Sequence, residues 1–332
     1  MKVASLKEGG RDGTLIVVDK ALKKAVRVGD SARTLQAALE DWSNVAPQLN
    51  RVYELLNASN AETVNGEQVF ALDFAKLAAP LPRAYEFVDG SAYLPHVERV
   101  RRARGAEVPK SFYSDPLMYQ ATSAGFYGPR DPVLVTSEEY GIDLEAEVVV
   151  ITDDVPMAVT PAQAAEYIQL VGLINDVSLR NLIPDELNKG FGFLQSKPRS
   201  ALSPVFVTPD ELGAQWKNAK VHLPLVTHIN GQKFGAPEAG DDMQFGFAEL
   251  IAHAAKTRPL SAGTIVGSGT VANQDESRGA SCLAERRTLE VIATGKPVTS
   301  FLKFGDSVRI EMFDKDGHSI FGAIEQQIRQ AI

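Results

Sequence analysis

Residues 140–150 of the chain read YGIDLEAEVVV, and the interpretation of the whole sequence depends on this stretch. As a β-strand it places Asp143, Glu145 and Glu147 on one face and apolar side chains on the other, because successive side chains point to opposite faces. Carboxylates two residues apart on a strand lie about 6–7 Å apart. Burying them unpaired is costly, since each loses hydration and repels its neighbour. Either this face is exposed to water, or a cation lies between the carboxylates.

Length and composition bound the class of protein. The chain has 332 residues, of which 44% are hydrophobic and 23% are charged, as in an ordinary globular protein. This length allows one large domain and a second, small one. The formal net charge of −8 argues against a nucleic-acid-binding or membrane-surface protein, because both normally carry an excess of basic residues. We therefore expect neither nucleic acid nor membrane among the partners.

Cysteine content and hydropathy point to a cellular compartment. Cys282 is the single cysteine, so an internal disulfide framework is excluded, which fits a reducing cytosol. The first residues, MKVASLKEGGRDG, lack the apolar run of a signal peptide, and no apolar stretch is long enough to cross a membrane. These features predict a cytoplasmic protein.

The N-terminal part of the sequence predicts a small β-rich domain. Three strand-like runs and one amphipathic helix follow each other, at residues 1–7, 13–19, 24–29 and 34–56. The pattern then changes, and Pro80 and Pro82 mark a seam near residues 75–83. We expect a small N-terminal domain at residues 1–75 and a larger domain at residues 76–332.

Most of the larger segment reads as β-structure. Hairpin turns are predicted at Asn230-Gly231 and Asp316-Gly317. Two helices interrupt the strands: one begins at Thr160-Pro161, with Gln163 completing a capping box, and one covers about residues 245–256. Strands dominate without the regular alternation of a doubly wound sheet. The predicted fold class is therefore α+β and β-rich.

Two further acids are candidate ligands. Asp176 follows the apolar run 170–174 and precedes Arg180 by four residues, so it could equally be a cap or a salt-bridge partner. Asp89 precedes a Gly-Ser pair, where an Asp is also common for turn formation alone. His96 follows Asp89 by seven residues, in what reads as irregular chain. Of the five histidines in the sequence, only this one follows shortly after a candidate ligand in such chain.

Five blocks of the sequence resemble the fumarylacetoacetate hydrolase family. They are VDGSAYLPH (88–96), DLEAEVVVITDDVP (143–156), NDVSLRNLIPDELNKGFGFLQSKP (175–198), GTIVGSGTVAN (263–273) and SCLAERRTLE (281–290). The resemblance extends from about residue 80 to the C-terminal end. It implies a mixed β-roll of the fumarylacetoacetate hydrolase type behind a small N-terminal β-rich domain. It also suggests a homodimer.

The resemblance implies a divalent metal site. In that family an Asp, an E-x-E pair and a later Asp bind Mg²⁺, Mn²⁺ or Ca²⁺, and the matching residues are Asp89, Glu145, Glu147 and Asp176. A site made only of carboxylate oxygens suits these hard cations and not Zn²⁺. Asp143 is left outside this set, and we expect it at the solvent end of the strand.

The resemblance also implies catalytic residues. His96 would act as the general base on water, oriented by Glu285, with Glu290 as the alternative. Arg180 and Lys197 would stabilise a developing oxyanion. Residues on the substrate side are Thr270, Ser91 and Tyr127. Ser91 stands where long members of the family have Tyr, and Tyr127 is displaced from the family's Gly-Tyr position, so these departures concern the substrate side and not the metal.

The implied function is hydrolysis of a C–C bond in a 1,3-diketo acid. Fumarylacetoacetate, giving fumarate and acetoacetate in tyrosine or other aromatic degradation, is the leading substrate. The alternatives are hydrolysis of fumarylpyruvate or another acylpyruvate, decarboxylation or tautomerisation of a 2-oxo acid such as oxaloacetate, and a non-catalytic member that keeps the cation as a clamp. The dyad of His96 and Glu285 separates the enzymes from the clamp, which needs only carboxylates.

Two other patterns favour different functions. Gly267, Gly269 and Ala272 fit the G-x-G-x-x-A motif of dinucleotide-binding folds, but the residues that follow are polar and aperiodic, whereas that fold needs a helix. A cluster of basic residues could suggest nucleic acid; it comprises Arg99, Arg101, Arg102, Arg104 and Lys110. In an acidic chain we expect a solvated face, or a lid that attracts an anionic substrate.

Overall fold

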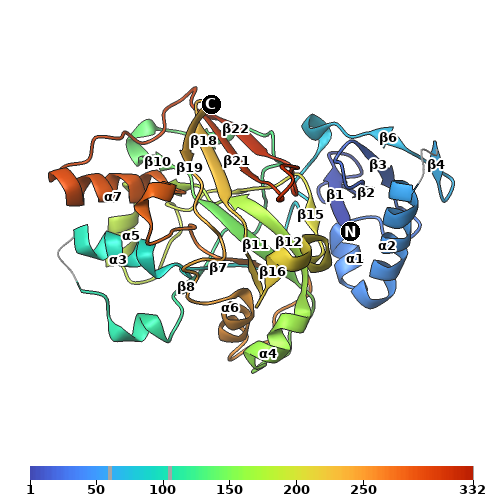
Figure 1. Ribbon diagram of the computed structural model, residues 1–332, viewed down its shortest axis with the longest axis horizontal. Coiled ribbons are helices and arrows are strands. Elements are labelled where there is room, and N and C mark those ends of the chain that lie inside the picture. The colour runs from blue at the N-terminus through green and yellow to red at the C-terminus, as the bar shows by residue number, and fades with distance from the viewer. Residues whose placement is uncertain (59–61, 104–106, 332) are drawn as a thin grey trace.

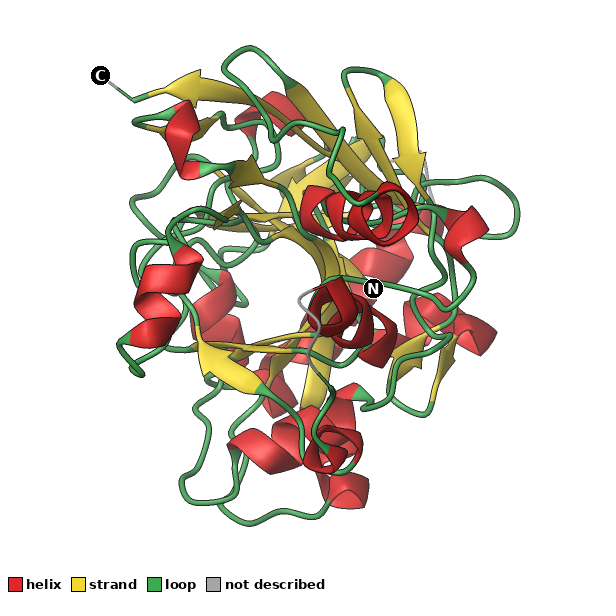
Figure 2. Ribbon diagram, turned by 90° about the vertical axis from the view of Figure 1, so that its left-hand side faces the viewer, coloured by secondary structure: helices red, strands yellow, loops and turns green. Residues whose placement is uncertain are grey.

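A computed structural model describes residues 1–58, 62–103 and 107–331. Figure 1 shows a small lobe formed by the N-terminal residues beside a larger body that holds the C-terminal end. Strands β1 (Lys2–Leu6), β2 (Thr14–Val18) and β3 (Lys24–Arg27) form at the three predicted stretches of this lobe. Figure 2 shows helices arranged around the strands.

One large sheet runs through both parts of the chain. Its order is β6-β3-β2-β1-β15-β12-β11-β20-β7-β8, with β14 paired to β12. The remaining strands of this sheet are β6 (Phe70–Ala71), β7 (Phe87–Gly90), β8 (Met118–Gln120), β11 (Ala146–Thr152), β12 (Ile168–Asn175), β14 (Ala201–Leu202), β15 (Phe206–Val207) and β20 (Ile265–Gly267).

A second sheet has the order β19-β18-β21-β22-β9. Its strands are β9 (Val133–Val135), β18 (Leu225–Ile229), β19 (Gln232–Gly235), β21 (Ser307–Met312) and β22 (Ile324–Gln330). Three two-stranded pairs complete the described β-structure: β4 (Thr63–Val64) with β5 (Glu67–Gln68), β10 (Ile142–Asp143) with β13 (Ser178–Leu179), and β16 (Trp216–Lys217) with β17 (Lys220–Val221).

The helices lie outside the sheets. The described α-helices are α1 (Leu35–Leu39), α2 (Trp42–Ala58), α3 (Leu94–Ala103), α4 (Pro161–Ala164), α5 (Ile183–Asn188), α6 (Phe247–Ala254) and α7 (Leu283–Thr294). Short 3-10 helices are η1 (Phe74–Lys76), η2 (Lys110–Tyr113), η3 (Glu138–Tyr140), η4 (Ala165–Tyr167), η5 (Pro209–Gln215) and η6 (Glu276–Arg278). No described helix is long and apolar enough to cross a membrane.

The N-terminal lobe shares its core with the larger body. Lys2 on β1 faces Val207 on β15, so the lobe's strands continue the central sheet. One apolar cluster joins Val3 and Val17 of the lobe to Ile174 and other buried residues of the body. Burial of this apolar surface stabilises both parts together. The fold class, β-rich α+β with a small N-terminal β domain, is confirmed, while the boundary after residue 75 stays a prediction.

Several predicted elements form as expected. The hairpin at Asn230-Gly231 joins β18 and β19, with both turn residues at positive φ. Thr160 and Gln163 form the predicted capping box of α4. The predicted Asp316-Gly317 turn lies inside a longer connection from β21 to β22 and does not join the two strands directly.

Other predictions about local structure are wrong. The helix expected over residues 34–56 is two helices, because the chain turns at residues 40–41. His96 lies in α3 and not in irregular chain, and α5 and α7 were not expected at all. The expected strand at residues 140–150 divides into β10 and β11, with residues 144 and 145 between them.

Candidate active site

Three predicted metal ligands meet at neighbouring strands of the central sheet. Glu147 lies on β11, Asp89 on β7, and Asp176 directly after β12. Within the residues described, each offers a carboxylate oxygen, and these oxygens all lie within 4.8 Å of one another. Strand β20 runs between β11 and β7, and its Gly267 has no side chain to separate the acids. A Cβ at Gly267 would lie 2.2 Å from Asp89 Oδ1 and 3.3 Å from Glu147 Oε2.

Two of these carboxylates lack a cationic partner in the part of the chain that the structure describes. Both oxygens of Glu147 are buried with no hydrogen-bond partner. Asp89 accepts from the backbone N–H of Gly269 at 3.1 Å. Burial, and then the charge of Asp176, raises the pKa of Asp89 to about 7. Burial, and then Asp89, raises the pKa of Glu147 well above its usual value. A divalent cation fits this pair of unpaired acids and their all-oxygen donor set.

Glu145, the fourth predicted ligand, has a different environment. Arg180 Nη2 donates to Glu145 Oε1 at 2.6 Å, Ser178 Oγ donates to Oε2 at 3.2 Å, and the Lys197 ammonium also contacts Oε2. Burial alone would raise the pKa of Glu145, but Arg180 and Lys197 outweigh it and hold the pKa below its usual value. Glu145 borders the three-carboxylate cluster as an ionised, paired group, and its role as a ligand stays a prediction.

Asp143 is not at the solvent end of a strand, which corrects the prediction. It is fully buried. Its Oδ2 accepts from Arg180 Nε at 2.8 Å, and its oxygens accept from the backbone N–H groups of Leu283 at 2.7 Å and Ala284 at 2.9 Å. These N–H groups open helix α7, where a negative charge is favoured. Asp143 therefore joins Arg180 to the helix that carries Glu285.

Asp176 is the most fully hydrogen-bonded member of the cluster. It accepts from Lys197 Nζ at 2.5 Å, from Ser200 Oγ at 2.5 Å and from Tyr119 OH at 2.8 Å. Burial lowers the pKa of Lys197, but Asp176 and Glu145 outweigh burial and leave it above the usual value. Sequence reasoning missed Tyr119. Its position on β8, opposite Asp89 in register, could be found only once β7 and β8 were known to pair.

His96 and Glu285 form the predicted dyad. His96 Nδ1 lies 3.1 Å from Glu285 Oε2, and the Glu285 side chain is fully buried. The imidazole is partly exposed, so its other nitrogen remains available to a substrate or water. Glu290 instead accepts from the backbone N–H groups of Val298 at 2.6 Å and Thr299 at 2.8 Å. Glu285 is therefore the carboxylate that contacts His96.

Arg99 completes a group of three side chains. Its Nη1 donates to Glu285 Oε1 at 2.5 Å and its Nη2 to the carbonyl oxygen of Asn273 at 2.6 Å. Arg99 is only 8% exposed, so the expectation that it belongs to a solvated basic face is wrong. Arg104, another member of that predicted face, lies outside the described residues. His96 and Arg99 are three residues apart, and both reach Glu285 from helix α3.

The three-residue group adjoins the carboxylates. Glu145 forms a backbone bridge with Cys282, the N-cap residue of α7. His96 is among the groups whose charge lowers the pKa of Glu145, after Arg180 and Lys197. The Cys282 thiol is buried, and burial raises its pKa well above the usual value, which suits packing rather than nucleophilic attack.

The three predicted substrate-side residues differ in their burial and in how they lie relative to the acids. Thr270 is buried and follows Gly269, which contacts Asp89. Ser91 is half-buried two residues after Asp89. The Tyr127 ring lies under Arg199, with the guanidinium carbon 5.3 Å from the ring centroid. Contact of these residues with substrate stays a prediction.

Known proteins resemble this chain over its whole length. Residues 86–329 match the family described as fumarylacetoacetate (FAA) hydrolase C-terminal, and residues 1–83 match fumarylacetoacetase N-terminal domain 2. An oxaloacetate tautomerase of Bacillus subtilis is 23% identical over 266 residues, covering 78% of this chain and 82% of that protein. A 2,4-didehydro-3-deoxy-L-rhamnonate hydrolase of Sphingomonas is 24% identical over 200 residues, covering 59% of this chain and 61% of that protein.

Solved structures show the same fold. A fumarylacetoacetate hydrolase from Exiguobacterium antarcticum superposes with a TM-score of 0.64 at 18% identity, and both chains are covered completely. A maleylpyruvate hydrolase from Sphingobium superposes with a TM-score of 0.66 at 14% identity, again over 100% of both chains. The family match to residues 86–329 extends over well more than half of the sequence. The chain belongs to the fumarylacetoacetate hydrolase family.

Proposed function

We propose that this protein is a divalent-metal-dependent hydrolase that cleaves a C–C bond in a 1,3-diketo acid. Fumarylacetoacetate, which would give fumarate and acetoacetate, is the leading substrate. The observation that carries the proposal is the His96–Glu285 pair in the same chain as a carboxylate cluster whose Asp89 and Glu147 have no cationic partner among the described residues. A bound cation alone would need the acids and no dyad.

The acids supply the site for the cation. Asp89, Glu147 and Asp176 would hold it, with Glu145 as the fourth ligand, and Mg²⁺, Mn²⁺ or Ca²⁺ would suit these oxygens. When bound, such an ion polarises carbonyl oxygens of the substrate. The unpartnered oxygens of Glu147 are the best support for this assignment, because a buried carboxylate without a partner is strongly destabilising.

The dyad supplies the base. Glu285 accepts from His96 Nδ1–H, which leaves Nε2 free to take a proton from water. The resulting hydroxide adds to a carbonyl carbon of the diketo acid. The C–C bond then breaks, its electron pair remains on the leaving carbon, and the proton held by His96 is returned to that carbon. The hydroxyl group of the water thus ends on one product and its proton on the other.

Arg180 and Lys197 are the proposed electrostatic groups. Both are cations held against Glu145, at the border of the dyad and the carboxylates. Preorganised cations stabilise negative charge that develops on substrate oxygens. Thr270, Ser91 and Tyr127 are the proposed substrate contacts.

Tautomerisation of oxaloacetate is the second candidate. It is supported by the relative in Bacillus subtilis that carries this name. The reaction moves a proton between carbon and oxygen and needs a base but no attacking water. Fumarylpyruvate or another acylpyruvate would fit the hydrolytic scheme equally well, and decarboxylation of oxaloacetate would need neither water nor the complete dyad.

Assays of the purified protein with Mg²⁺ test these alternatives. We expect release of fumarate from fumarylacetoacetate, or of pyruvate from an acylpyruvate. Turnover of oxaloacetate without hydrolysis of any diketo acid would favour the second candidate. If the protein binds Mg²⁺ but turns over neither a diketo acid nor oxaloacetate, the non-catalytic member with a structural cation is favoured. Analytical ultracentrifugation tests the homodimer that the family resemblance suggests.

A further inference from the structure

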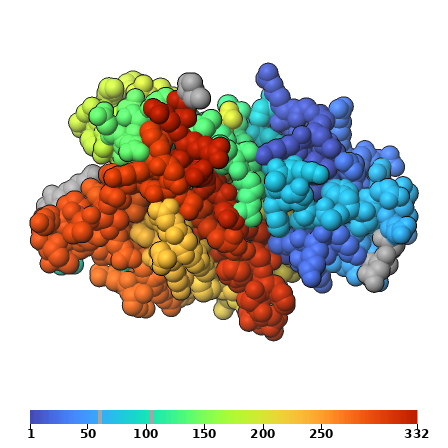
Figure 3. Space-filling model, turned by 90° about the horizontal axis from the view of Figure 1, so that it is seen from above, coloured from blue at the N-terminus to red at the C-terminus, as the bar shows by residue number. Residues whose placement is uncertain are grey.

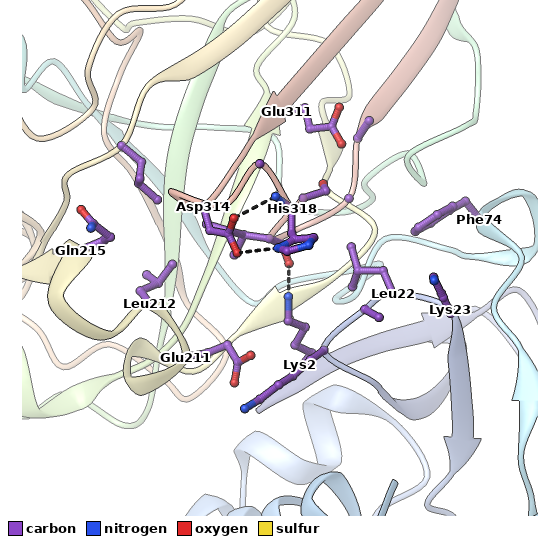
Figure 4. A pocket seen from close by; sticks show the side chains of 18 of the residues that line it. Lys2, Leu22, Lys23, Phe74, Glu211, Leu212, Gln215, Glu311, Asp314 and His318 are labelled. Atoms are coloured by element: carbon purple, nitrogen blue, oxygen red, sulfur yellow. Dashed lines mark hydrogen bonds and ion pairs between the residues drawn. The ribbon is translucent and has the colours of Figure 1, made fainter. Parts of the chain in front are cut away.

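One cavity lies away from the carboxylates, at the junction of the N-terminal lobe and the larger body. The volume of this cavity is about 810 Å³. Figure 4 shows Lys2 from β1, Leu22 and Lys23 facing Asp314 and His318 of the connection between β21 and β22. Figure 3 shows the lobe as a distinct mass against the body, so a ligand here would touch both.

This cavity is separate from the candidate active site. Lys2 faces Val207 on β15, and Val207 faces Val171 on β12. Asp176 follows Val171 by five residues, which corresponds to about 17 Å along an extended strand. None of the proposed catalytic or metal-binding residues lines the cavity.

Lys2 is a buried cation without a counter-ion. It is 4% exposed, and its ammonium donates to the carbonyl oxygen of Ile320 at 2.8 Å. Among the residues described, no carboxylate forms an ion pair with it. Burial lowers the pKa of Lys2 and nearby acids only partly oppose this, as expected for a charge that lacks a close partner.

Two exposed lysines add to this charge. Lys20 and Lys23 line the same cavity, and neither ammonium has a carboxylate partner among the described residues. An ammonium has three donors, and one carbonyl oxygen satisfies only part of what Lys2 offers. The cavity therefore presents unpaired donors from three lysines.

The acids that line the cavity are already engaged. Glu211 accepts from Tyr53 OH at 2.6 Å, and Glu311 pairs with Arg309 at 2.5 Å. Asp314 accepts from the backbone N–H groups of His318 at 2.8 Å and Asp316 at 2.9 Å. The carboxylates of the cavity are therefore occupied by other donors, whereas the lysine ammoniums have no carboxylate partner among the described residues.

Apolar side chains form part of the wall, beside further polar residues such as Arg130, Arg309 and Gln215. Phe74 and Leu22 contribute from the lobe side, while Leu212, Leu223 and Ile320 contribute from the body. Sites for small organic molecules combine apolar surface with polar groups that fix the orientation of the ligand. The volume is also within the range of such sites.

We propose that this junction cavity binds a small organic dianion with an apolar body, such as an aryl phosphate or a dicarboxylate. Its negative groups would pair with Lys2, Lys20 and Lys23, and its apolar part would lie against Phe74 and the leucines. Because the two sides of the cavity come from the lobe and the body, the ligand would tie them together.

Calorimetric titration with phenyl phosphate, in the presence of EDTA, tests the proposal. We expect saturable binding of one molecule per chain, with benzyl alcohol, which has the ring but no charge, binding much more weakly. Inorganic phosphate and succinate serve as further probes of the charged part. Saturation by none of these anions at millimolar concentration would overturn the proposal.

Variants locate the binding. Lys2→Met should weaken phenyl phosphate at least about tenfold, the loss of one charge-assisted hydrogen bond. If this variant does not fold, Lys20→Glu with Lys23→Glu replaces it, since both side chains are exposed. Lys256→Glu, on an exposed lysine elsewhere, is the matched charge control and should bind as the wild type does.

The result is independent of the proposed enzyme activity. Glu147→Gln should leave phenyl phosphate affinity unchanged, because the carboxylate cluster is distant from the cavity. Equal affinity in the lysine variants and the wild type would place the anion elsewhere and overturn the proposal. An affinity lost only in Glu147→Gln would do the same, since it would assign the anion to the active site.

Discussion

Arg99 and His96 hold opposite oxygens of the same buried carboxylate. Arg99 Nη1 lies 2.5 Å from Glu285 Oε1, while His96 Nδ1 lies 3.1 Å from Glu285 Oε2. The arginine also donates to backbone carbonyl oxygens of residues 273 and 274. Glu285 is thus fixed from both sides, and Arg99 is a positioning residue for the proposed base.

Replacing Arg99 should separate positioning from metal binding. Removing one partner of a buried ion pair commonly costs about 3–5 kcal/mol of unfolding free energy, because the other charge remains buried. We expect Arg99→Gln to lower the urea midpoint and kcat, with Mg²⁺ affinity unchanged. Arg99→Lys should recover part of the stability but less of the activity, since an ammonium cannot bind the carboxylate and two carbonyls as a planar guanidinium does. Unchanged kcat in Arg99→Gln would contradict the positioning role.

His96 distinguishes hydrolysis from decarboxylation, which needs neither an attacking water nor the complete dyad. His96→Ala should leave Mg²⁺ binding nearly intact, because the imidazole is not among the proposed ligands. It should reduce hydrolysis by about 10²–10⁴-fold, the contribution of a positioned general base. Oxaloacetate decarboxylation should be much less affected. Glu285→Gln should show the same pattern with a smaller loss. The measurement is the ratio of the two activities at saturating Mg²⁺, and hydrolysis at the wild-type rate in His96→Ala would exclude this mechanism.

Replacing Glu147 should stabilise the metal-free protein but reduce its stabilisation by Mg²⁺. Glu147→Gln removes a buried carboxyl group that has no hydrogen-bond partner, so the metal-free variant should unfold at a higher temperature than the wild type. A ligand at a hundred times its Kd raises the free energy of unfolding by about 2.7 kcal/mol. Mg²⁺ at that concentration should stabilise the wild type by this amount and the variant by much less. Glu166→Gln, at an exposed position, is the control. Equal Mg²⁺ affinity by calorimetry would mean that Glu147 is not a ligand.

Gly267 tests the geometry of the cluster without changing its charge. In Gly267→Ala the new Cβ would meet Asp89 Oδ1 at 2.2 Å, so the carboxylate must move. We expect a large loss of Mg²⁺ affinity in a protein that still folds. Gly29→Ala is a suitable control, because nothing lies within 4 Å of a Cβ there. If both variants bind Mg²⁺ as the wild type does, Asp89 is not held at the ion.

The raised pKa of Asp89 predicts how stability and metal binding depend on pH. With a folded-state pKa of about 7, above the ordinary 3.8, the metal-free folded protein binds more protons than the unfolded chain between these values. Its stability should therefore fall as pH rises through this window. Mg²⁺ competes with the same proton, so its affinity should rise from pH 6 to pH 8 with release of protons. Calorimetry in buffers of different ionisation enthalpy measures this release, and a pH-independent affinity would contradict the assignment.

Local patterns in the sequence identified the candidate acids and several of the strands, and the family resemblance singled out the ligand set. Alternation around Glu145 and Glu147 and the apolar run before Asp176 are local patterns, and a strand's period depends only on neighbouring residues. The three N-terminal strands and the capping box at Thr160 are local in the same sense. The family resemblance supplied His96 and Glu285, whose contact the structure shows.

The tertiary structure decided which acids are paired and what orients the dyad. Asp143 is buried against Arg180 and the start of α7, which donate to its carboxylate and come from distant parts of the sequence. Arg99 meets Glu285 across 186 positions, and Tyr119 meets Asp176 across 57. Such contacts depend on how α3 packs on α7 and β7 pairs with β8. No local pattern encodes them, because burial of a charge is decided by partners that only the folded chain brings near.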